Sequence, residues 1–326
     1  MQPAVDVIVV NFNAGEALLR CIRSVLAQDV PVGLTVVDNA STDGSAERAA
    51  AEFGGRPGFS LLRSPDNPGF ATAVNRAVPL PAIPLPTAPP PAPPTPADPT
   101  DAHLGPPAET SAPATADYLL LLNPDCELAS GALATLCRAL EADPAAGLAG
   151  PLVTDVAGRA QRGTLRLFPD PWTSFLTFSG LWRLGGRWPR FRGVEVDGAL
   201  PDEVTPAEAV SGACMLVRRS AFLAAGCMDP RYGLHCEDLD LMYRLRQGGW
   251  HCLYVPQARA VHQQGLSSHS RPWWVHWQKH RGMQRFFVKF QARRYPWPMR
   301  WAVIAGIWTR FALGLPLVLV RTLLRR

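Results

Sequence analysis

The stretch Asp117-Tyr118-Leu119-Leu120-Leu121-Leu122-Asn123-Pro124-Asp125 decides which fold this sequence can adopt. The hydrophobic run from Tyr118 to Leu122 is too short for a buried helix, so it predicts a strand buried on both faces, as in parallel sheets. Asn123 and Asp125 follow at the carboxyl end, where open α/β sheets bind their ligands. Their oxygens suit a hard divalent cation, although the same residue types also form ordinary turns.

Outward from this strand, short β-rich runs alternate with segments of helical period. Before it, strands are expected at 5–10, 34–38 and 59–62, and helices at 18–26, 46–53 and 70–78, with Ser41 or Thr42 capping the second helix. After it, helices are expected at 129–141 and 235–246, strands at 147–150, 210–217 and 251–255, and irregular structure over 155–205. This alternation predicts an α/β fold with a doubly wound, mostly parallel sheet.

Three acids crowd the start of the helix that Gly248-Gly249 closes. A solvated ion pair with Arg244, four residues further on, accounts for Asp240. Glu237 and Asp238 have no such explanation, and their expected place at the mouth of the sheet suits a general base.

Residues 79–116 hold 14 of the 33 prolines of the chain and almost no large apolar side chain. They predict an inserted, disordered loop biased to polyproline II, with a Pro-rich ligand for a partner domain as the alternative. The seven cysteines form no CxxC pair, and no signal peptide is evident, which predicts reduced thiols in the cytoplasm.

The charge is distributed unevenly. Residues 1–265 carry 20 basic and 27 acidic residues, whereas 266–326 carry 12 basic residues and no acidic one. Tryptophans accompany these charges, and 301–320 is almost wholly apolar, which favours an anionic membrane surface over nucleic acid as the partner of the tail. Arg310 and Pro316 interrupt the apolar stretch, so a basic, aromatic helical tail over 269–326 is expected to lie on the membrane rather than span it.

Six motifs occur in an order that resembles family 2 glycosyltransferases of GT-A fold, most of all their bacterial rhamnosyltransferase-like branch. The motifs are Val9-Val-Asn-Phe-Asn13, Val37-Asp-Asn-Ala-Ser-Thr-Asp-Gly44, Asn67-Pro-Gly-Phe-Ala71 through Asn75, Leu122-Asn-Pro-Asp125, Glu237-Asp-Leu-Asp240 through Arg244, and His262 through Ser268. The resemblance covers a domain over 1–268, into which the proline segment is inserted.

The resemblance also implies roles for individual residues. Phe12 would stack on a pyrimidine ring to which Asp38 hydrogen-bonds, and Asp125 and His262 would hold Mg²⁺ or Mn²⁺. The other donor-binding residues implied are Asn11, Asn13, Asn67, Gly69, Asn75, Asn123 and Glu237. Asn123 departs from the first acid of the family's DxD motif. Asp238 matches the catalytic base.

The expected reaction is inverting transfer of a sugar, with rhamnose as the candidate. The donor would be a nucleotide-diphosphate sugar, and the acceptor an envelope polysaccharide or a polyprenyl-linked glycan at the cytoplasmic face of the plasma membrane. A nucleotidyltransferase is the first alternative, but its basic phosphate loop is missing from Asn11-Phe-Asn-Ala-Gly15. A noncatalytic membrane adaptor is the second. Asp38, Asp125 and Asp238 at three separate strand ends speak against it.

Overall fold

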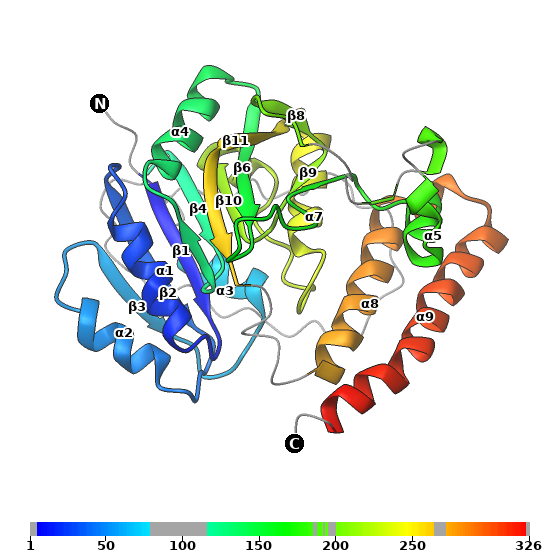
Figure 1. Ribbon diagram of the computed structural model, residues 1–326, viewed down its shortest axis with the longest axis horizontal. Helices are drawn as coiled ribbons and strands as arrows, with labels where there is room; N and C mark the ends of the chain where they lie inside the picture. Colours follow the sequence, from blue (N-terminus) through cyan, green and yellow to red (C-terminus); the bar gives the residue numbers. More distant parts are fainter. Residues whose placement is uncertain are drawn as a thin grey trace.

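The chain is built on a central β-sheet with helices on both faces, as the computed structural model shows (Figure 1). The structure describes residues 5–78, 116–184, 188–191, 193–194, 200–263 and 272–323. The loop predicted over 79–116 therefore lies outside the described residues except for Ala116, and so does the end of the last motif, 264–268. The architecture confirms the predicted α/β fold class.

The main sheet has nine strands in the order β3-β2-β1-β4-β10-β6-β11-β5, with β8 also paired to β11. The strands are β1 Val5–Asn11, β2 Val32–Asp38, β3 Phe59–Arg63, β4 Tyr118–Leu122, β5 Cys126–Leu128, β6 Ala146–Thr154, β8 Thr205–Ala207, β10 Cys214–Arg218 and β11 His251–His262. Strands β1 to β4 pair in parallel, as do β6 and β11, whereas β10 runs antiparallel to both β4 and β6. The sheet is therefore mixed but mostly parallel.

Strand β4 has the bounds and the burial that the sequence predicts. It lies between β1 and β10, and all five residues are buried. Tyr118, Leu120 and Leu122 belong to the hydrophobic core on one face of the sheet, and Leu119 and Leu121 to the core on the other. Each fully buried leucine contributes roughly 1.5–3 kcal/mol, so this strand stabilises both layers at once.

The helices divide between the two faces. On one face lie α1 Glu16–Leu26, α2 Ser45–Phe53 and α4 Ala132–Ala142; the other face is covered by α3 Phe70–Ala77, α6 Arg219–Ala224, α7 Glu237–Gln247 and α8 Pro272–Phe290. Helix α9, Trp297–Leu323, lies beside α8, and α5, Pro171–Ser179, lies beyond the sheet near them (Figure 1). The predicted helical tail is thus present, and α8 contributes Phe286 to the second core.

Two predicted segments differ from the structure. The strand predicted over 210–217 is two strands, β9 Ala209–Val210 and β10, because the backbone leaves the sheet at Gly212 to pass close to Asp238. Strand β9 pairs instead with β7, Leu165–Arg166. The segment 155–205, predicted to be irregular, contains β7, α5 and the first residue of β8. Asp170 and Thr173 form a capping box at the start of α5.

The predicted N-cap of the second helix is wrong. Helix α2 begins at Ser45 after Gly44, whose φ is 74°. The hydroxyl of Ser41 instead accepts hydrogen bonds from the Asn13 backbone N–H and the Asn11 amide, which fastens this loop to the end of β1. Thr42 donates its backbone N–H to the Asn13 side chain.

The prediction of a solvated Asp240–Arg244 pair is also wrong in one respect. The pair is present, with Arg244 Nε 2.6 Å from Asp240 Oδ1, but Asp240 is fully buried. Helix α8 covers it, and Lys289 places its Nζ 2.6 Å from the other carboxylate oxygen. The helix dipole and spacing therefore identified the partner but not the burial.

No disulfide joins any of the seven cysteines in the structure, and five of the seven are buried. Among the described residues, no helix combines the length and the apolar character needed to cross a bilayer.

Candidate active site

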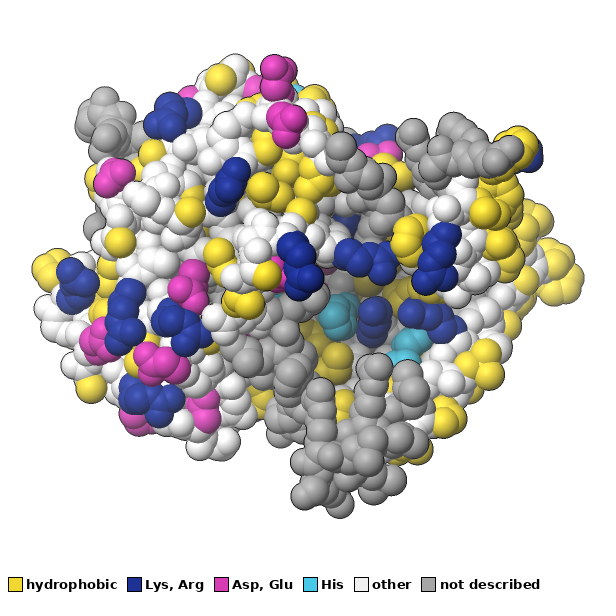
Figure 2. Space-filling model, in the orientation of Figure 1, with side chains coloured by type: hydrophobic (Ala, Val, Ile, Leu, Met, Phe, Trp, Pro, Cys, Tyr) yellow, Lys and Arg dark blue, Asp and Glu magenta, His cyan; other side chains and the backbone are white. Residues whose placement is uncertain are grey.

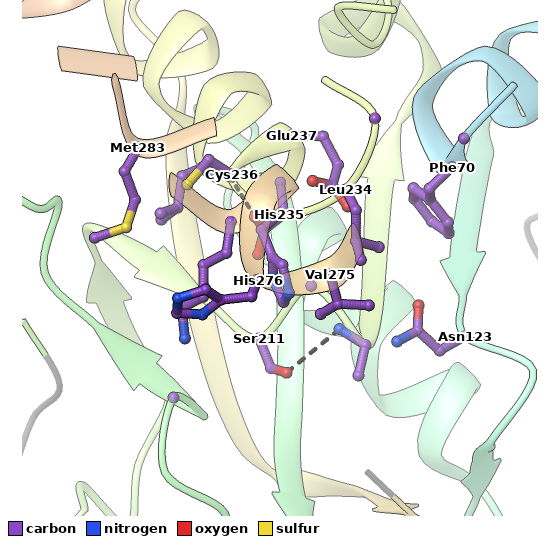
Figure 3. Close-up of a pocket in the computed structure, with 18 of the residues that line it drawn as sticks. Phe70, Asn123, Ser211, Leu234, His235, Cys236, Glu237, Val275, His276 and Met283 are labelled. Atoms are coloured by element: carbon purple, nitrogen blue, oxygen red, sulfur yellow. Dashed lines mark hydrogen bonds between the residues drawn. The ribbon is translucent and has the colours of Figure 1, made fainter. Parts of the chain in front are cut away.

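A cavity of about 1300 Å³ lies where the carboxyl ends of β1 and β4 face α5, α8 and α9. Asn123 and Phe70 lie on one side of it and His276 and Met283 on the other, with His235 between them (Figure 3). Ligand sites for one small molecule commonly measure about 300–1,000 Å³. The cavity is therefore large enough for two substrates to meet.

The loop after β1 is held by the loop after β2. The Asn11 amide donates to Asp38 Oδ1 over 2.7 Å, and both side chains are buried. The Asn13 side chain accepts the Thr42 backbone N–H. Asn11, Asn13 and Asp38 thus lie behind the wall and fix the loop, whereas Phe12 lines the cavity itself.

Two further predicted residues, Asn67 and Gly69, line the cavity beside Asn39. The Asn39 amide donates to Asn67 Oδ1 over 3.3 Å. Within the part of the chain that the structure describes, Asn39 Oδ1 is buried and has no donor, so it can accept a hydrogen bond from a ligand. Asn75 lies elsewhere, since its side chain bonds the backbone N–H and C=O of Met228.

Asp125 and His262 meet at the ends of β4 and β11, both nearly buried, with His262 Nε2 3.1 Å from Asp125 Oδ1. Gln161 contacts His262 twice: its amide nitrogen donates to the His262 carbonyl, and its Oε1 lies 3.1 Å from Nδ1, where it can accept a hydrogen bond from Nδ1–H. With the proton on Nδ1, Nε2 directs a lone pair at the carboxylate. A divalent cation held by both side chains would relieve that repulsion.

These donors fit a divalent cation that phosphates help to hold. No group of three or more His, Cys, Asp or Glu side chains suited to a metal occurs in the described residues. Mg²⁺ commonly takes one or two protein ligands and completes its shell with phosphate oxygens and water. Asn123 lines the cavity beside Asp125, within the same turn.

Asp238 and Glu237 open α7 and line the same cavity. Arg166 of β7 places its Nη2 2.5 Å from Asp238 Oδ2. Burial alone would raise the pKa of Asp238, but the charge and hydrogen bond of Arg166 outweigh it and hold that pKa below its usual value. Burial and the Asp238 carboxylate raise the pKa of Glu237. Of the two neighbouring acids, Asp238 is therefore the ionised one.

The turn before α7 has an unusual backbone. His235 and Cys236 have φ values of 66° and 69°, a left-handed conformation that costs non-glycine residues of order 1–3 kcal/mol each. Helix α8 covers this turn at Gly282, where a Cβ would lie 2.6 Å from the His235 carbonyl oxygen. Burial, and next the charge of Lys279, lower the pKa of His235 to about 4, so the turn carries a neutral imidazole.

Several lining residues were not predicted. Arg166 and Gln161 come from the segment 155–205, and Lys279 and Arg310 from the tail. Only Lys279 and Arg310 belong to a pattern visible in the sequence, the positive charge of the tail. That pattern predicted a membrane surface as the partner and gave no indication of a cavity.

A family model described as "Glycosyltransferase like family 2" matches residues 3–284. The chain belongs to glycosyltransferase family 2. The predicted family is confirmed, and its match extends into α8.

This family 2 glycosyltransferase is similar to two rhamnosyltransferases. It is 30% identical over 331 residues to the N-acetylglucosaminyl-diphospho-decaprenol L-rhamnosyltransferase of Mycobacterium tuberculosis, covering 100% of this chain and 96% of that one. It is 30% identical over 154 residues to the rhamnosyltransferase WbbL of Escherichia coli, covering 47% and 55% of the two chains. The predicted resemblance to the rhamnosyltransferase-like branch agrees with both.

A solved structure shows the same fold. The mannosyltransferase of Pyrobaculum calidifontis in complex with GDP-Man and Mn²⁺ matches with a TM-score of 0.52 and 19% identity, over 98% of this chain and 72% of that one. At that identity the likeness concerns the fold alone. It supports the GT-A assignment.

Proposed function

We propose that this family 2 glycosyltransferase moves a sugar, with rhamnose as the candidate, from a nucleotide-diphosphate donor to a polyprenyl-diphosphate-linked glycan, inverting the anomeric centre. One observation carries the proposal: the ionised Asp238 and the Asp125–His262 pair line one cavity. The relative of M. tuberculosis, by its name, acts on a diphospho-decaprenol acceptor, and it matches this chain end to end.

In this proposal the two acidic centres have separate tasks. Asp125 and His262 would hold Mg²⁺ or Mn²⁺, and the bound cation would supply positive charge against the departing nucleoside diphosphate. Asp238 accepts the proton of the acceptor hydroxyl as the oxygen attacks the anomeric carbon from the opposite face. A single displacement inverts that carbon and requires no covalent intermediate on the enzyme.

For the donor, we propose that Phe12 stacks on a pyrimidine ring, at the loop that Asn11, Asn13 and Asp38 fix. Asn39 Oδ1 would accept a hydrogen bond from the nucleoside, with Asn67, Gly69 and Asn123 along the sugar diphosphate. Asn75 would act indirectly, by tying α3 to the segment before the catalytic turn. Glu237 has a raised pKa, which favours its neutral acid form, so its carboxyl group can donate a hydrogen bond to the donor substrate.

We also propose that residues 1–268 form the catalytic domain and that 269–326 attach it to the anionic inner face of the plasma membrane. The support is the charge of the tail, with 12 basic and no acidic residues in 266–326, together with exposed tryptophans such as Trp297 and Trp301. Nucleic acid would pair with the charges but would gain little from the exposed apolar side chains, whereas a membrane can bind both.

The test is incubation of the full chain with a panel of nucleotide sugars, Mn²⁺ and an acceptor mimic, with release of nucleoside diphosphate as the readout. Release of nucleoside diphosphate together with a glycosylated acceptor is the expected result. In a parallel incubation with nucleoside triphosphates and sugar 1-phosphates, release of inorganic diphosphate would instead indicate a nucleotidyltransferase. No release in either incubation would favour an adaptor.

Asp125→Ala is expected to weaken metal-dependent donor binding, and His262→Ala to weaken it less, because a carboxylate is the better ligand for a hard cation. Calorimetric titration of a nucleoside diphosphate with and without Mn²⁺ measures this. Asp143→Ala, at a surface ion pair with His251, is the control. Binding and activity that persist in excess EDTA would remove the metal from the mechanism.

Arg166→Met is expected to move the acid limb of the kcat/KM profile to higher pH. Arg166 holds the pKa of Asp238 down, so without it the carboxylate takes up its proton at a higher pH and the ionised base is lost sooner. Arg159→Met, which removes an exposed cation on a neighbouring turn, should leave the limb in place. An unshifted limb in Arg166→Met would show that Arg166 does not set the ionisation of Asp238.

A further inference from the structure

The cavity has a second charged wall, opposite the strand ends. Lys279 of α8 and Arg310 of α9 both line it, together with His276. On α8 the lining residues Val275, His276, Lys279 and Met283 follow helical spacing, so one face of this helix forms the wall. Lys, Arg and His side chains gather over the hollow between the sheet and the α8–α9 pair (Figure 2).

Arg310 is held in an arrangement that suits an anion. Its guanidinium carbon lies 3.7 Å from the ring centroid of Phe178 on α5, so the aromatic ring packs against one flat face of the guanidinium group. The N–H donors lie in the plane and point away from that ring. Nη1 is buried and finds no acceptor among the described residues, and burial lowers the pKa of the guanidinium. A buried donor of this kind calls for a ligand.

Lys279 places positive charge near the catalytic turn. Its charge helps to lower the pKa of His235, which stands three residues before Asp238. Gly282, one turn further along α8, contacts the His235 carbonyl, which fixes the helix against the turn. A ligand on Lys279 would therefore lie close to the acceptor side of the reaction.

We propose that Lys279 and Arg310 form a subsite for the diphosphate of the lipid-linked acceptor. The inference rests on the proposed function and names the part of the acceptor that this wall recognises. The two cations line one wall of the cavity and match the charge of a diphosphate. Arg162 also lines the cavity, and its guanidinium lies 5.0 Å from the ring centroid of Trp182, in the segment that follows α5.

The surroundings of the subsite fit an amphiphile. Phe178, the ring that contacts Arg310, is 40% exposed. Leu181 and Leu184 continue the apolar surface beyond α5. Leu313 and Leu319 of α9 are exposed as well. A polyprenyl chain attached to the diphosphate can leave the cavity along these side chains, whereas a nucleotide would gain nothing from them.

The experiment compares two acceptors that carry the same sugar, phytanyl-diphosphate N-acetylglucosamine and octyl N-acetylglucosaminide, in neutral detergent micelles. Lys279→Met and Arg310→Met are expected to raise KM for the diphosphate acceptor by roughly ten- to one-hundredfold. KM for the nucleotide sugar and for the octyl glycoside should stay within a few-fold of wild type. Arg310→Lys should lie between wild type and Arg310→Met, because the charge remains while the planar fork is lost.

The matched controls are Arg281→Met and Arg293→Met, which remove exposed cations from α8 and from the turn between α8 and α9. An equal rise of KM for the nucleotide sugar would assign the subsite to the donor and overturn the inference. Unchanged kinetics in correctly folded Lys279→Met and Arg310→Met variants would also overturn the inference. Calorimetric binding of the phytanyl diphosphate without donor separates the proposed function from the proposed subsite. If the Lys279 and Arg310 variants bind it more weakly than wild type, the subsite is supported even when wild type transfers no sugar.

Discussion

Replacing Asp238 with Asn is expected to lower the rate of sugar transfer by roughly two to four decades, the usual contribution of a general base. The amide keeps the size of the side chain but cannot accept the acceptor proton. Donor binding should change little, because Asp125 and His262 form a separate centre and remain intact. Single-turnover rates together with the Kd of a nucleoside diphosphate measure the two effects apart.

Asp29→Asn, an exposed carboxylate on the loop after α1, is the matched control and should transfer at the wild-type rate. The Asn variant also loses the charge that pairs with Arg166, so its fold should be checked by thermal unfolding. A correctly folded Asp238→Asn enzyme that turns over within a few-fold of wild type would refute the assignment of Asp238 as the base.

The central strand was predictable because its information is local. Five hydrophobic residues bounded by Asp117 and Pro124 can satisfy their burial only in the middle of a two-faced sheet, and β4 has those bounds. The same holds for α7, whose acids, apolar spacing and closing glycines are contiguous in the sequence. Local patterns of this kind fixed the strand ends, and with them the positions of Asp125 and Asp238.

The divided strand at Gly212 was not predictable from the hydrophobic pattern. Val210 and Cys214–Val217 are all buried, so the run looks continuous. The break arises because Asp238, far along the chain, occupies the space at Gly212, where a Cβ would lie 2.5 Å from a carboxylate oxygen. Only tertiary packing reveals that contact.

The partners of the site residues were also hidden, since they come from distant segments. Arg166 and Asp238 are 72 residues apart, and Asp125 and His262 are 137 apart. Motif order placed Asp238 and Asp125, but nothing in the segment around Arg166 distinguishes it from the other arginines of 155–205. The charge of the tail was visible in the sequence, whereas the fold was needed to show that two of its cations face the cavity.

The second large effect is expected on stability, from Lys289→Met. Lys289 of α8 places its Nζ 2.7 Å from Asp229 and 2.6 Å from Asp240, and both carboxylates are buried. Each keeps one arginine, Arg231 or Arg244, when the lysine is removed. Breaking a buried ion pair costs about 3–5 kcal/mol, and the remaining arginines place this variant near 3 kcal/mol. The free energy of unfolding from urea titration measures the loss.

The same loss should depend on pH in a defined direction. Burial alone would raise the pKa of Asp229, but hydrogen bonds from Arg231 and Lys289 outweigh it and hold that pKa well below its usual value. A carboxylate with a depressed folded pKa stabilises the protein above its unfolded pKa of about 3.9 and loses that contribution as the pH falls through the folded value. The gap between wild type and Lys289→Met should therefore be full at neutral pH and shrink in acid.

A double-mutant cycle decides whether the pairing itself is responsible. Lys289→Met combined with Asp240→Asn should cost less than the sum of the single changes, with a coupling of roughly 0.5–3 kcal/mol. Arg281→Met, on the exposed side of the same helix, removes a cation without this effect. Equal unfolding midpoints for Lys289→Met and Arg281→Met would mean that α8 is held by its apolar contacts, such as Phe286 against Tyr243, and not by the buried charges.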